Sequence, residues 1–351
     1  MDIKSMIKQK VKNNILLYTI LKLLKNKDDV EYFEKIKQIN EPSYKQISLR
    51  YNENASKKIV VGEIDCVSSL DGFFAAMRWI LNAIYFCEKS GFLPVIKMPE
   101  NWLYHDEQMP KEKNPFEYFF EQPADISVQE LHDCNMVYEC KIQHCYLAEK
   151  MNDSDKLTYL YTDEYVSEMS KIVKKYLRFN EVTKQILEKD VVAKDINSEV
   201  LGVHIRGTDY KQNCNHHPVF VEPSDYFEYI DTALKKGFKK IYLATDDSEI
   251  VDLFIQRYGK EILICDEFVS RSTGEIGVHI KESEKKNGYK LGLDVITDMY
   301  ALANCGGIIS GLSQVSLFAR LFNKNFNEKY RYDVVVSKAI NENHKKFTIK
   351  K

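Results

Sequence analysis

A run of polar side chains follows an apolar stretch in the segment LGVHIRGTDYK, residues 201–211. His204, Arg206, Thr208 and Asp209 come almost one after another, at the point where a buried strand would end. Ligands of an open parallel sheet bind beyond the carboxyl ends of its strands. An arginine can grip a phosphate through two parallel N–H donors. The pattern therefore predicts an anion site that contains Arg206.

Two further apolar runs end in polar residues. LATDD brings Asp246 and Asp247, and GIISGLSQVS brings Ser310, then Ser313 and Gln314 at the start of a helix. Backbone N–H groups and hydroxyls at a helix N-terminus are a standard anion site. With Arg206 opposite, they predict a pocket for a phosphorylated ligand.

Each of these residues also has a purely structural interpretation. Asp247 is expected to cap a helix, because aspartate suits a helix start; Asp246 fits that role less well. His204 could be a core histidine, and Arg206 could form a structural ion pair with Asp209. Ser313 and Gln314 could simply cap a helix. The sequence leaves these alternatives open.

The elements that must position these residues alternate between strand and helix. Residues 57–65 predict a strand, 66–91 a helix that ends at Gly91, and 92–98 a strand, which together make a βαβ unit. From residue 197 on, we expect strands and helices in turn, at 198–207, 222–238, 239–247, 248–259, 261–267, 291–306, 307–312 and 313–323. This order predicts a doubly wound α/β fold.

We expect four parts along the chain. Residues 1–56 form a helical basic segment, 57–196 the first α/β domain, 197–330 the second, and 331–351 a C-terminal segment. The first 27 residues surround the apolar run NNILLYTILKLL with lysines, and this run is too short to span a bilayer. The segment either contacts an anionic membrane surface or packs on its own domain; we favour the second interpretation.

Composition excludes several classes of protein. Lys plus Arg total 50 and Asp plus Glu total 52, for a formal charge of −2, which argues against a nucleic-acid partner. There is no GxxxxGK[ST] motif, and no GxGxxG motif opens the first βα unit. A P-loop NTPase and a dinucleotide oxidoreductase are therefore disfavoured.

Eight cysteines are scattered without a disulfide framework, and no cleavable signal peptide precedes them. Both features predict a reducing, cytoplasmic setting. The tightest group lacks the paired spacing of zinc ligands, so buried thiols in a β-rich patch are expected rather than a metal site; its members are His132, Cys134, Cys140, His144 and Cys145.

Four segments resemble one family. VHIRGTDY resembles the HxRxxD-type motif of GDP-fucose-dependent fucosyltransferases, the superfamily with α1,6-, nodulation-type, α1,2- and protein O-fucosyltransferases. LATDD and LSQVSLFARL look like the two motifs that follow it, and NPFEYFFEQP (114–123) is similar to bacterial sugar transferases of this group. The resemblance is clear over residues 197–325 and looser before them.

The resemblance implies a GT-B type fold, in which two Rossmann-like domains face each other across a cleft. It also implies inverting, metal-independent transfer of fucose from GDP-fucose to a glycan acceptor, with no cofactor. By matching position, the donor-binding residues would be His204, Arg206, Asp246, Arg271, Asp298, Ser313 and Gln314, with Asp294 as a second candidate for the position of Asp298. Arg206 would bind the β-phosphate, and Asp209 would orient Arg206 or touch the donor.

Two positions depart from the family pattern. Gly207 stands where a second arginine is common, and Cys214 stands where the α1,6 branch has its proposed base. Inversion needs a group that takes the acceptor's proton. The local candidates are Asp209, His216, His217 and Glu222. Two rival functions stay open: the same fold with another nucleotide sugar, and a non-catalytic nucleotide- or glycan-binding homologue.

Overall fold

The computed structural model describes residues 20, 24–25, 48–66, 72–141, 156–266, 269–274, 287–326 and 329–344. The chain divides into two compact units, Met1–Ile47 and Ser48–Lys351. Residues 1–27, for which membrane contact was considered, lie almost wholly outside the described residues. Within the described ranges, every helix is too short or too polar to cross a membrane.

The predicted βαβ unit is present in the first half of the larger unit. Strand β2 (Lys57–Asp65), helix α4 (Phe73–Ser90) and strand β3 (Leu93–Lys97) follow one another, and the two strands pair in parallel. Gly91 ends α4 in the left-handed conformation, with φ 76°, and its N–H donates to the carbonyls of Cys87 and Glu88. Glycine adopts this conformation without steric cost, which explains the clean helix end.

Two more strands complete this sheet in the order β1-β4-β2-β3. Strand β4 (Cys134–Lys141) runs parallel to β2, and β1 (Ser48–Tyr51) pairs antiparallel with β4. The sheet thus includes residues before position 57, where we expected the domain to start. Cys134 and Cys140 are buried thiols on β4, as predicted; His144 and Cys145 lie outside the described residues.

The second sheet is entirely parallel. Its strands are β5 (Val200–Ile205), β6 (Lys240–Thr245), β7 (Leu263–Ile264), β8 (Gly307–Ser310) and β9 (Tyr332–Val335), in the order β7-β6-β5-β8-β9. The order reverses between β5 and β8, which are adjacent although about a hundred residues separate them in the chain. Such a switch point is where doubly wound sheets bind ligands. β9 lies within the segment that we expected to follow this domain.

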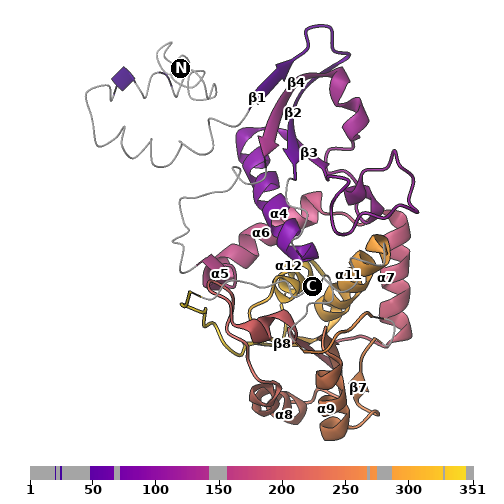
Figure 1. The fold of residues 1–351 in the computed structure, drawn as a ribbon, viewed down its shortest axis with the longest axis vertical. Helices are drawn as coiled ribbons and strands as arrows, with labels where there is room; N and C mark the ends of the chain where they lie inside the picture. The colour runs from indigo at the N-terminus through magenta and orange to yellow at the C-terminus, as the bar shows by residue number, and fades with distance from the viewer. Residues whose placement is uncertain are drawn as a thin grey trace, which may run out of the picture. The chain divides into compact units, whose positions relative to one another are not determined.

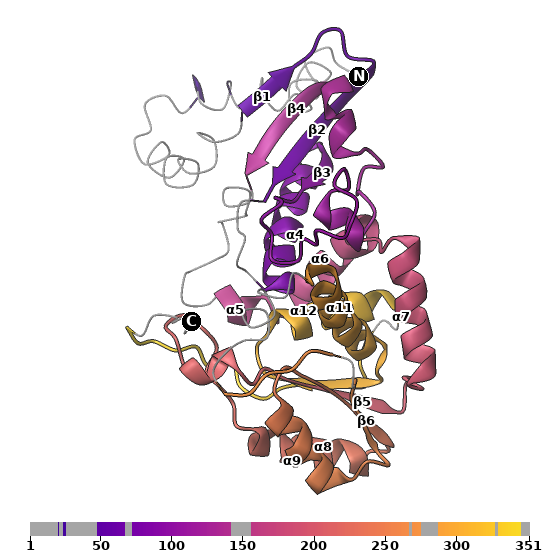
Figure 2. The same cartoon turned by 45° about the vertical axis from the view of Figure 1, so that its right-hand side comes forward.

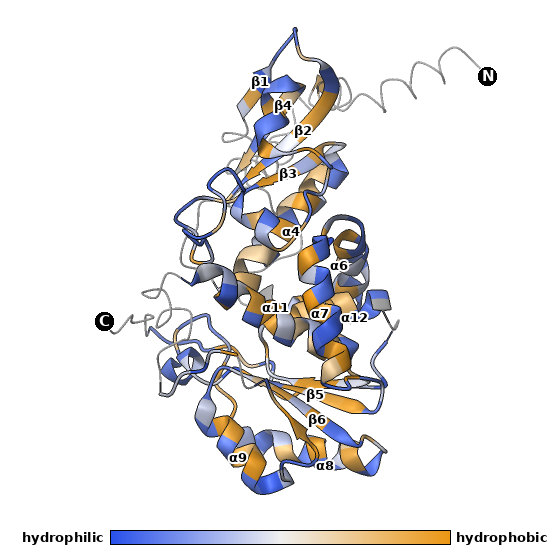
Figure 3. Cartoon of the chain, turned by 90° about the vertical axis from the view of Figure 1, so that its right-hand side faces the viewer, coloured by the Kyte–Doolittle hydropathy of each residue, from blue (hydrophilic) through white to orange (hydrophobic). Residues whose placement is uncertain are grey.

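Helices cover both faces of the second sheet (Figures 1 and 2). Helices α8 (Phe227–Lys235) and α9 (Ser248–Tyr258) pack on one face, and α11 (Gly288–Asn304) and α12 (Gln314–Phe326) on the other. Leu201, Val203 and Ile205 of β5 join the core under α8 and α9. Because side chains alternate along a strand, His204 faces the α11 and α12 layer. Figure 3 shows β5 and β6 largely in the hydrophobic colour, as expected for strands covered on both faces.

Three helices connect the two sheets: α5 (Lys156–Tyr159), α6 (Asp163–Tyr176) and α7 (Glu181–Ala193). Short 3₁₀ turns span Pro115–Tyr118, Val128–Asp133, Asp209–Gln212 and Pro223–Tyr226. The aromatic residues of 114–120 are core rather than a surface platform, since Phe116, Phe119 and Phe120 are all buried.

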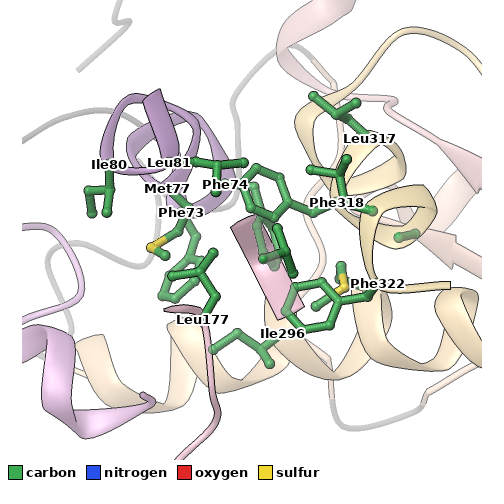
Figure 4. Close-up of a cluster of buried hydrophobic side chains, with 14 of the residues drawn as sticks. Phe73, Phe74, Met77, Ile80, Leu81, Leu177, Ile296, Leu317, Phe318 and Phe322 are labelled. Carbon is green, nitrogen blue, oxygen red and sulfur yellow. The ribbon is translucent and has the colours of Figure 1, made fainter. Parts of the chain in front are cut away.

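One hydrophobic cluster joins the two halves (Figure 4). Phe74 of α4 packs against Phe318 of α12 with ring centroids 4.8 Å apart, and Ile296 of α11 belongs to the same cluster. An aromatic pair of this kind contributes about 1 kcal/mol beyond the burial of its area. Two α/β halves, each built on a sheet with parallel strands, confirm the predicted fold class.

Candidate functional site

The switch point of the second sheet carries a hollow. In the register of the sheet, His204 on β5 lies beside Ser310 on β8 and Ala244 on β6, so the carboxyl ends of three strands meet there. The hollow encloses about 240 Å³, including space open to solvent. It is lined by His204, Arg206, Tyr210, Val219, Val221, Tyr226, Gly311, Leu312 and Ser313. The structure thus brings together His204, Arg206 and Ser313, as the sequence predicts.

Arg206 is held by two carboxylates. Its Nε and Nη2 donate to the two oxygens of Asp209, at 2.8 and 3.0 Å, and its Nη1 lies 2.9 Å from Asp246 Oδ2. Burial opposes the charged form, but the two carboxylates outweigh it and raise the pKa of Arg206. The ion pair with Asp209 that the sequence allowed is therefore present. It fixes a charged guanidinium whose side chain is 24% exposed at the hollow.

Asp246 orders the loop that follows β5. Its carboxylate accepts hydrogen bonds from the Gly207 N–H at 2.8 Å and from the Thr208 hydroxyl at 2.6 Å. A side chain at Gly207 has no room, because a Cβ there would lie 2.5 Å from the Cβ of Asp247. Asp246 is not among the residues that line the hollow; it acts on the site through Arg206 and this loop.

Asp247 caps α9, as the sequence favours. It accepts from the Glu249 N–H at 3.0 Å, which satisfies a free donor of the first turn. Its second oxygen lies 2.6 Å from the Lys211 Nζ. A fully buried carboxylate needs such a partner, so Lys211 and Asp247 stabilise each other.

His204 is buried, with 5% of its surface exposed. Burial lowers its pKa to about 4, and Arg206 and Arg320 add to this effect against the opposite pull of Asp246. The imidazole is therefore neutral at physiological pH. Its Nδ1 is buried and has no hydrogen-bond partner among the described residues. A core histidine satisfied by its neighbours, the alternative left open, does not describe it.

At the start of α12, where the sequence predicts an anion site, one backbone donor is already bonded within the protein. The N–H of Ser313 donates to the Tyr161 hydroxyl at 2.7 Å, so a ligand cannot also take it. Ser313 offers its side chain to the hollow instead. The Oε1 of Gln314 is buried without a hydrogen-bond partner in the part of the chain that the structure describes, and Gln314 does not line the hollow. Tyr161, which lies outside the motif, thus occupies the backbone N–H of Ser313.

Asp298 and Arg271 belong to a separate buried cluster. Asp298 accepts from the Tyr242 hydroxyl at 2.7 Å, and burial raises its pKa to about 7 against the lowering effects of Tyr242 and Arg271. The Nε and Nη2 of Arg271 are buried without hydrogen-bond partners among the described residues. Neither residue lines the hollow with Arg206. Asp294, the second candidate, accepts from the Lys290 Nζ at 2.7 Å and from Ser270 at 3.3 Å.

The candidates for the proton acceptor lie around the hollow rather than in its lining. Asp209 has both oxygens engaged by Arg206. His216, His217 and Glu222 are exposed. Cys214 is buried, with its Sγ 3.8 Å from the Gln212 Oε1. None of the five is among the lining residues.

Three tyrosines at this site were not predicted. Tyr210 and Tyr226 line the hollow, and Tyr161 reaches it through Ser313. Tyr210 is adjacent to Asp209 in the motif, so its position in the sequence was a usable signal. Tyr161 is 45 residues before Arg206 in the chain, and no local pattern marks it. Among the described residues, no three histidine, cysteine, aspartate or glutamate side chains gather as a metal-binding group.

The fold and the site define a class: a two-part α/β protein with an arginine-containing hollow at the switch point of a parallel sheet. Residues 130–315 match the family described as alpha-(1,6)-fucosyltransferase N- and catalytic domains. This is more than half of the chain, and it includes strands β5, β6 and β8 and every residue that lines the hollow. The protein belongs to this family and is a glycosyltransferase of the fucosyltransferase type.

Crystal structures of two fucosyltransferases are similar to this chain. The fucosyltransferase NodZ from Bradyrhizobium is 16% identical, with 76% of this chain and 94% of that chain covered and a TM-score of 0.43. POFUT1 in complex with GDP-fucose is 12% identical, with 80% of this chain and 99% of that chain covered and a TM-score of 0.48.

Proposed function

We propose that this protein transfers fucose from GDP-fucose to a hydroxyl group of a glycan, with inversion at the sugar carbon and without a metal. The family supports fucosyl transfer. The observation that carries the proposal is the Arg206 guanidinium, which Asp209 and Asp246 hold at the switch point of the sheet. NodZ soaked with GDP-fucose and POFUT1 with GDP-fucose agree with this choice of donor.

The chemistry of the reaction suits this arrangement. When the bond between the sugar and the diphosphate breaks, negative charge develops on the leaving diphosphate. A guanidinium that is already fixed stabilises this charge without having to reorganise. Arg206 takes that role, and Ser313, which also lines the hollow, can add its hydroxyl as a donor. His204 is neutral, so it can hydrogen-bond the donor without adding charge.

The proton of the acceptor hydroxyl needs an acceptor group near the hollow. The candidates are His217, whose ring centre lies 6.5 Å from that of the lining residue Tyr210, and Glu222, which follows the lining residue Val221; both are exposed. Asp209, with both oxygens on Arg206, is better placed to orient the arginine than to act as a base. We further propose a cytoplasmic protein, which the seven free cysteines among the described residues support. Peripheral membrane contact through residues 1–27 stays a prediction, which lipid sedimentation of a chain without them would test.

The test begins with the donor. In a thermal-shift panel of GDP, UDP and ADP, we expect GDP to raise the melting temperature most, because it binds only the folded state. Release of GDP from GDP-fucose in the presence of candidate glycans then measures transfer. Stabilisation by UDP or ADP alone would favour the same fold with another nucleotide sugar. Binding of GDP without turnover on any acceptor would favour a non-catalytic homologue.

The variant Arg206→Ala tests whether the Arg206 guanidinium stabilises the leaving diphosphate. We expect GDP release to fall about 100-fold or more, since a charge-assisted contact to the leaving group is lost. Arg257→Ala is the matched control, because Arg257 forms an exposed ion pair with Asp231 on the far helices α8 and α9. The control should retain full activity. An Arg206→Ala protein that remains folded and active would contradict the proposed role.

A further inference from the structure

Tyr161 connects the start of α12 to the segment between the two sheets. It lies between α5 and α6, outside the motifs that resemble the family. Its hydroxyl accepts the Ser313 N–H at 2.7 Å, bonds to the Ser313 carbonyl, and lies 2.7 Å from the Ser316 Oγ. The Tyr161 side chain therefore bonds to both the N–H and the carbonyl of Ser313.

These contacts fix where the Ser313 side chain points. With its N–H and its carbonyl both bound to Tyr161, the main chain of Ser313 cannot rotate freely. The hydroxyl of Ser313 then stays at the hollow that Arg206 also lines. Its hydroxyl accepts a long hydrogen bond of 3.3 Å from the Val315 N–H. A ligand in the hollow can therefore still bond to it.

Arg320 and the contacts that fix it hold Tyr161 in place. The Arg320 guanidinium lies 5.1 Å from the centre of the tyrosine ring, which gives a cation–π contact. Arg320 is itself fixed by Asp333 at 2.7 Å, the Ser310 hydroxyl at 3.0 Å and the Ser316 carbonyl at 3.1 Å. Burial raises the pKa of Tyr161, so its hydroxyl keeps the proton that it donates.

We propose that Tyr161 is a positioning residue for the donor diphosphate. It holds the main chain of Ser313 so that the Ser313 hydroxyl stays available beside Arg206. This inference rests on the proposed function, because it assumes that a nucleoside diphosphate occupies the hollow. It adds a residue from the segment between the sheets to a site that is otherwise built by the second sheet.

The test compares GDP with guanosine, which lacks the diphosphate, by calorimetry or ligand-observed NMR. Tyr161→Phe removes the hydroxyl and keeps the ring over Arg320. We expect it to weaken GDP binding about fivefold, the size of one ordinary hydrogen bond, and to leave guanosine binding unchanged. Tyr165→Phe is the matched control, since the buried hydroxyl of Tyr165 has no hydrogen-bond partner among the described residues. It should bind both ligands like the wild type.

A double-mutant cycle separates positioning from a general structural effect. If Tyr161 acts through Ser313, the double variant Tyr161→Phe/Ser313→Ala binds GDP no more weakly than Ser313→Ala alone. Additive losses, equal losses for GDP and guanosine, or unchanged or tighter GDP binding by Tyr161→Phe would each overturn the proposal. A wild-type protein that does not bind GDP would instead contradict the proposed function, which keeps the two failures distinct.

Discussion

Single residues in the second half keep their charges in fixed pairs. Arg206 pairs with Asp209 and Asp246, Lys211 with Asp247, and Arg320 with Asp333. The ion pairs of Lys211 and Arg320 support loops and helix starts around the hollow. Breaking a buried pair of this kind leaves one charge without compensation and costs several kcal/mol. The site is therefore organised before any ligand arrives.

Two buried groups of the second half, Asp298 on α11 and His204 on β5, respond to pH in opposite directions. The pKa of Asp298 is raised to about 7, so its contribution to stability falls as pH rises from about 4 to about 7. The pKa of His204 is lowered to about 4, so its contribution is lost as pH falls from about 6.5 to about 4. Between about pH 4 and pH 6.5 the two contributions to stability change in opposite directions. The pH dependence of the wild-type stability therefore does not show either contribution by itself.

The variant Asp298→Asn should separate the contribution of Asp298 to stability from that of His204. Asparagine still accepts from the Tyr242 hydroxyl and carries no charge, so we expect the variant to exceed the wild type by about 1–3 kcal/mol in free energy of unfolding at pH 8. The gain should shrink as pH falls and vanish below about pH 3, where the wild-type carboxyl is protonated in both states. Urea unfolding followed by circular dichroism across this range measures it. Asp231→Asn, at a half-exposed pair, should show no such gain, and a less stable Asp298→Asn at pH 8 would refute the argument.

At the scale of elements, α11 depends on a close approach to the first half. A Cβ at Gly292 would lie 2.5 Å from the Phe119 ring, and the Phe119 ring in turn stacks on Tyr289 of α11. The Tyr289 N–H donates to Asp106. A residue of the first half thus accepts a hydrogen bond from the first turn of α11. The helix that carries Asp298 is therefore placed by residues of the first half.

Gly292→Ala tests this packing. Alanine raises helix propensity by about 1 kcal/mol, but its methyl group must displace a buried ring, so we expect a net loss of about 1–2 kcal/mol. Denaturant unfolding measures the loss. Adding Phe119→Leu makes room and should restore part of it relative to Phe119→Leu alone. A Gly292→Ala protein more stable than the wild type would mean that the ring moves aside freely.

At the scale of the molecule, one hydrophobic cluster connects the two halves of the unit Ser48–Lys351. The cluster runs from α4 of the first half to α11 and α12 of the second. A domain with its own separate core could unfold alone, whereas this one cannot expose α12 without exposing α4. We therefore expect cooperative unfolding of the two halves.

Phe318→Ala makes that expectation measurable. Phe318 is fully buried on α12, and its loss should cost about 3–5 kcal/mol. Both tryptophans, Trp79 and Trp102, lie in the first half, so their fluorescence should report the same shift in midpoint as far-UV circular dichroism. Leu253→Ala, at a partly exposed position on α9, should shift neither by a comparable amount. A tryptophan transition that stays at its wild-type midpoint would show that the halves unfold independently.

Local patterns in the sequence predict the secondary structure around the hollow and single out its arginine. Short apolar runs predict β5 and β6, helical spacing predicts α9, α11 and α12, and the polar strand end marks Arg206 and His204. These features depend on neighbours a few residues away, through alternation, capping and helix-ending glycine. The cap role of Asp247 was predictable for the same reason.

Strand order and packing bring only some of these residues to the hollow. The pairing of β5 with β8 brought Ser313 beside Arg206, while Asp298 and Arg271 went to a second cluster around Tyr242. Tyr161 accepts the backbone N–H of Ser313, at the helix start where the sequence predicts an anion site. Such contacts join residues from about 40 to 150 positions apart. They follow from the order of strands and the packing of α6 on α12, which no local pattern encodes.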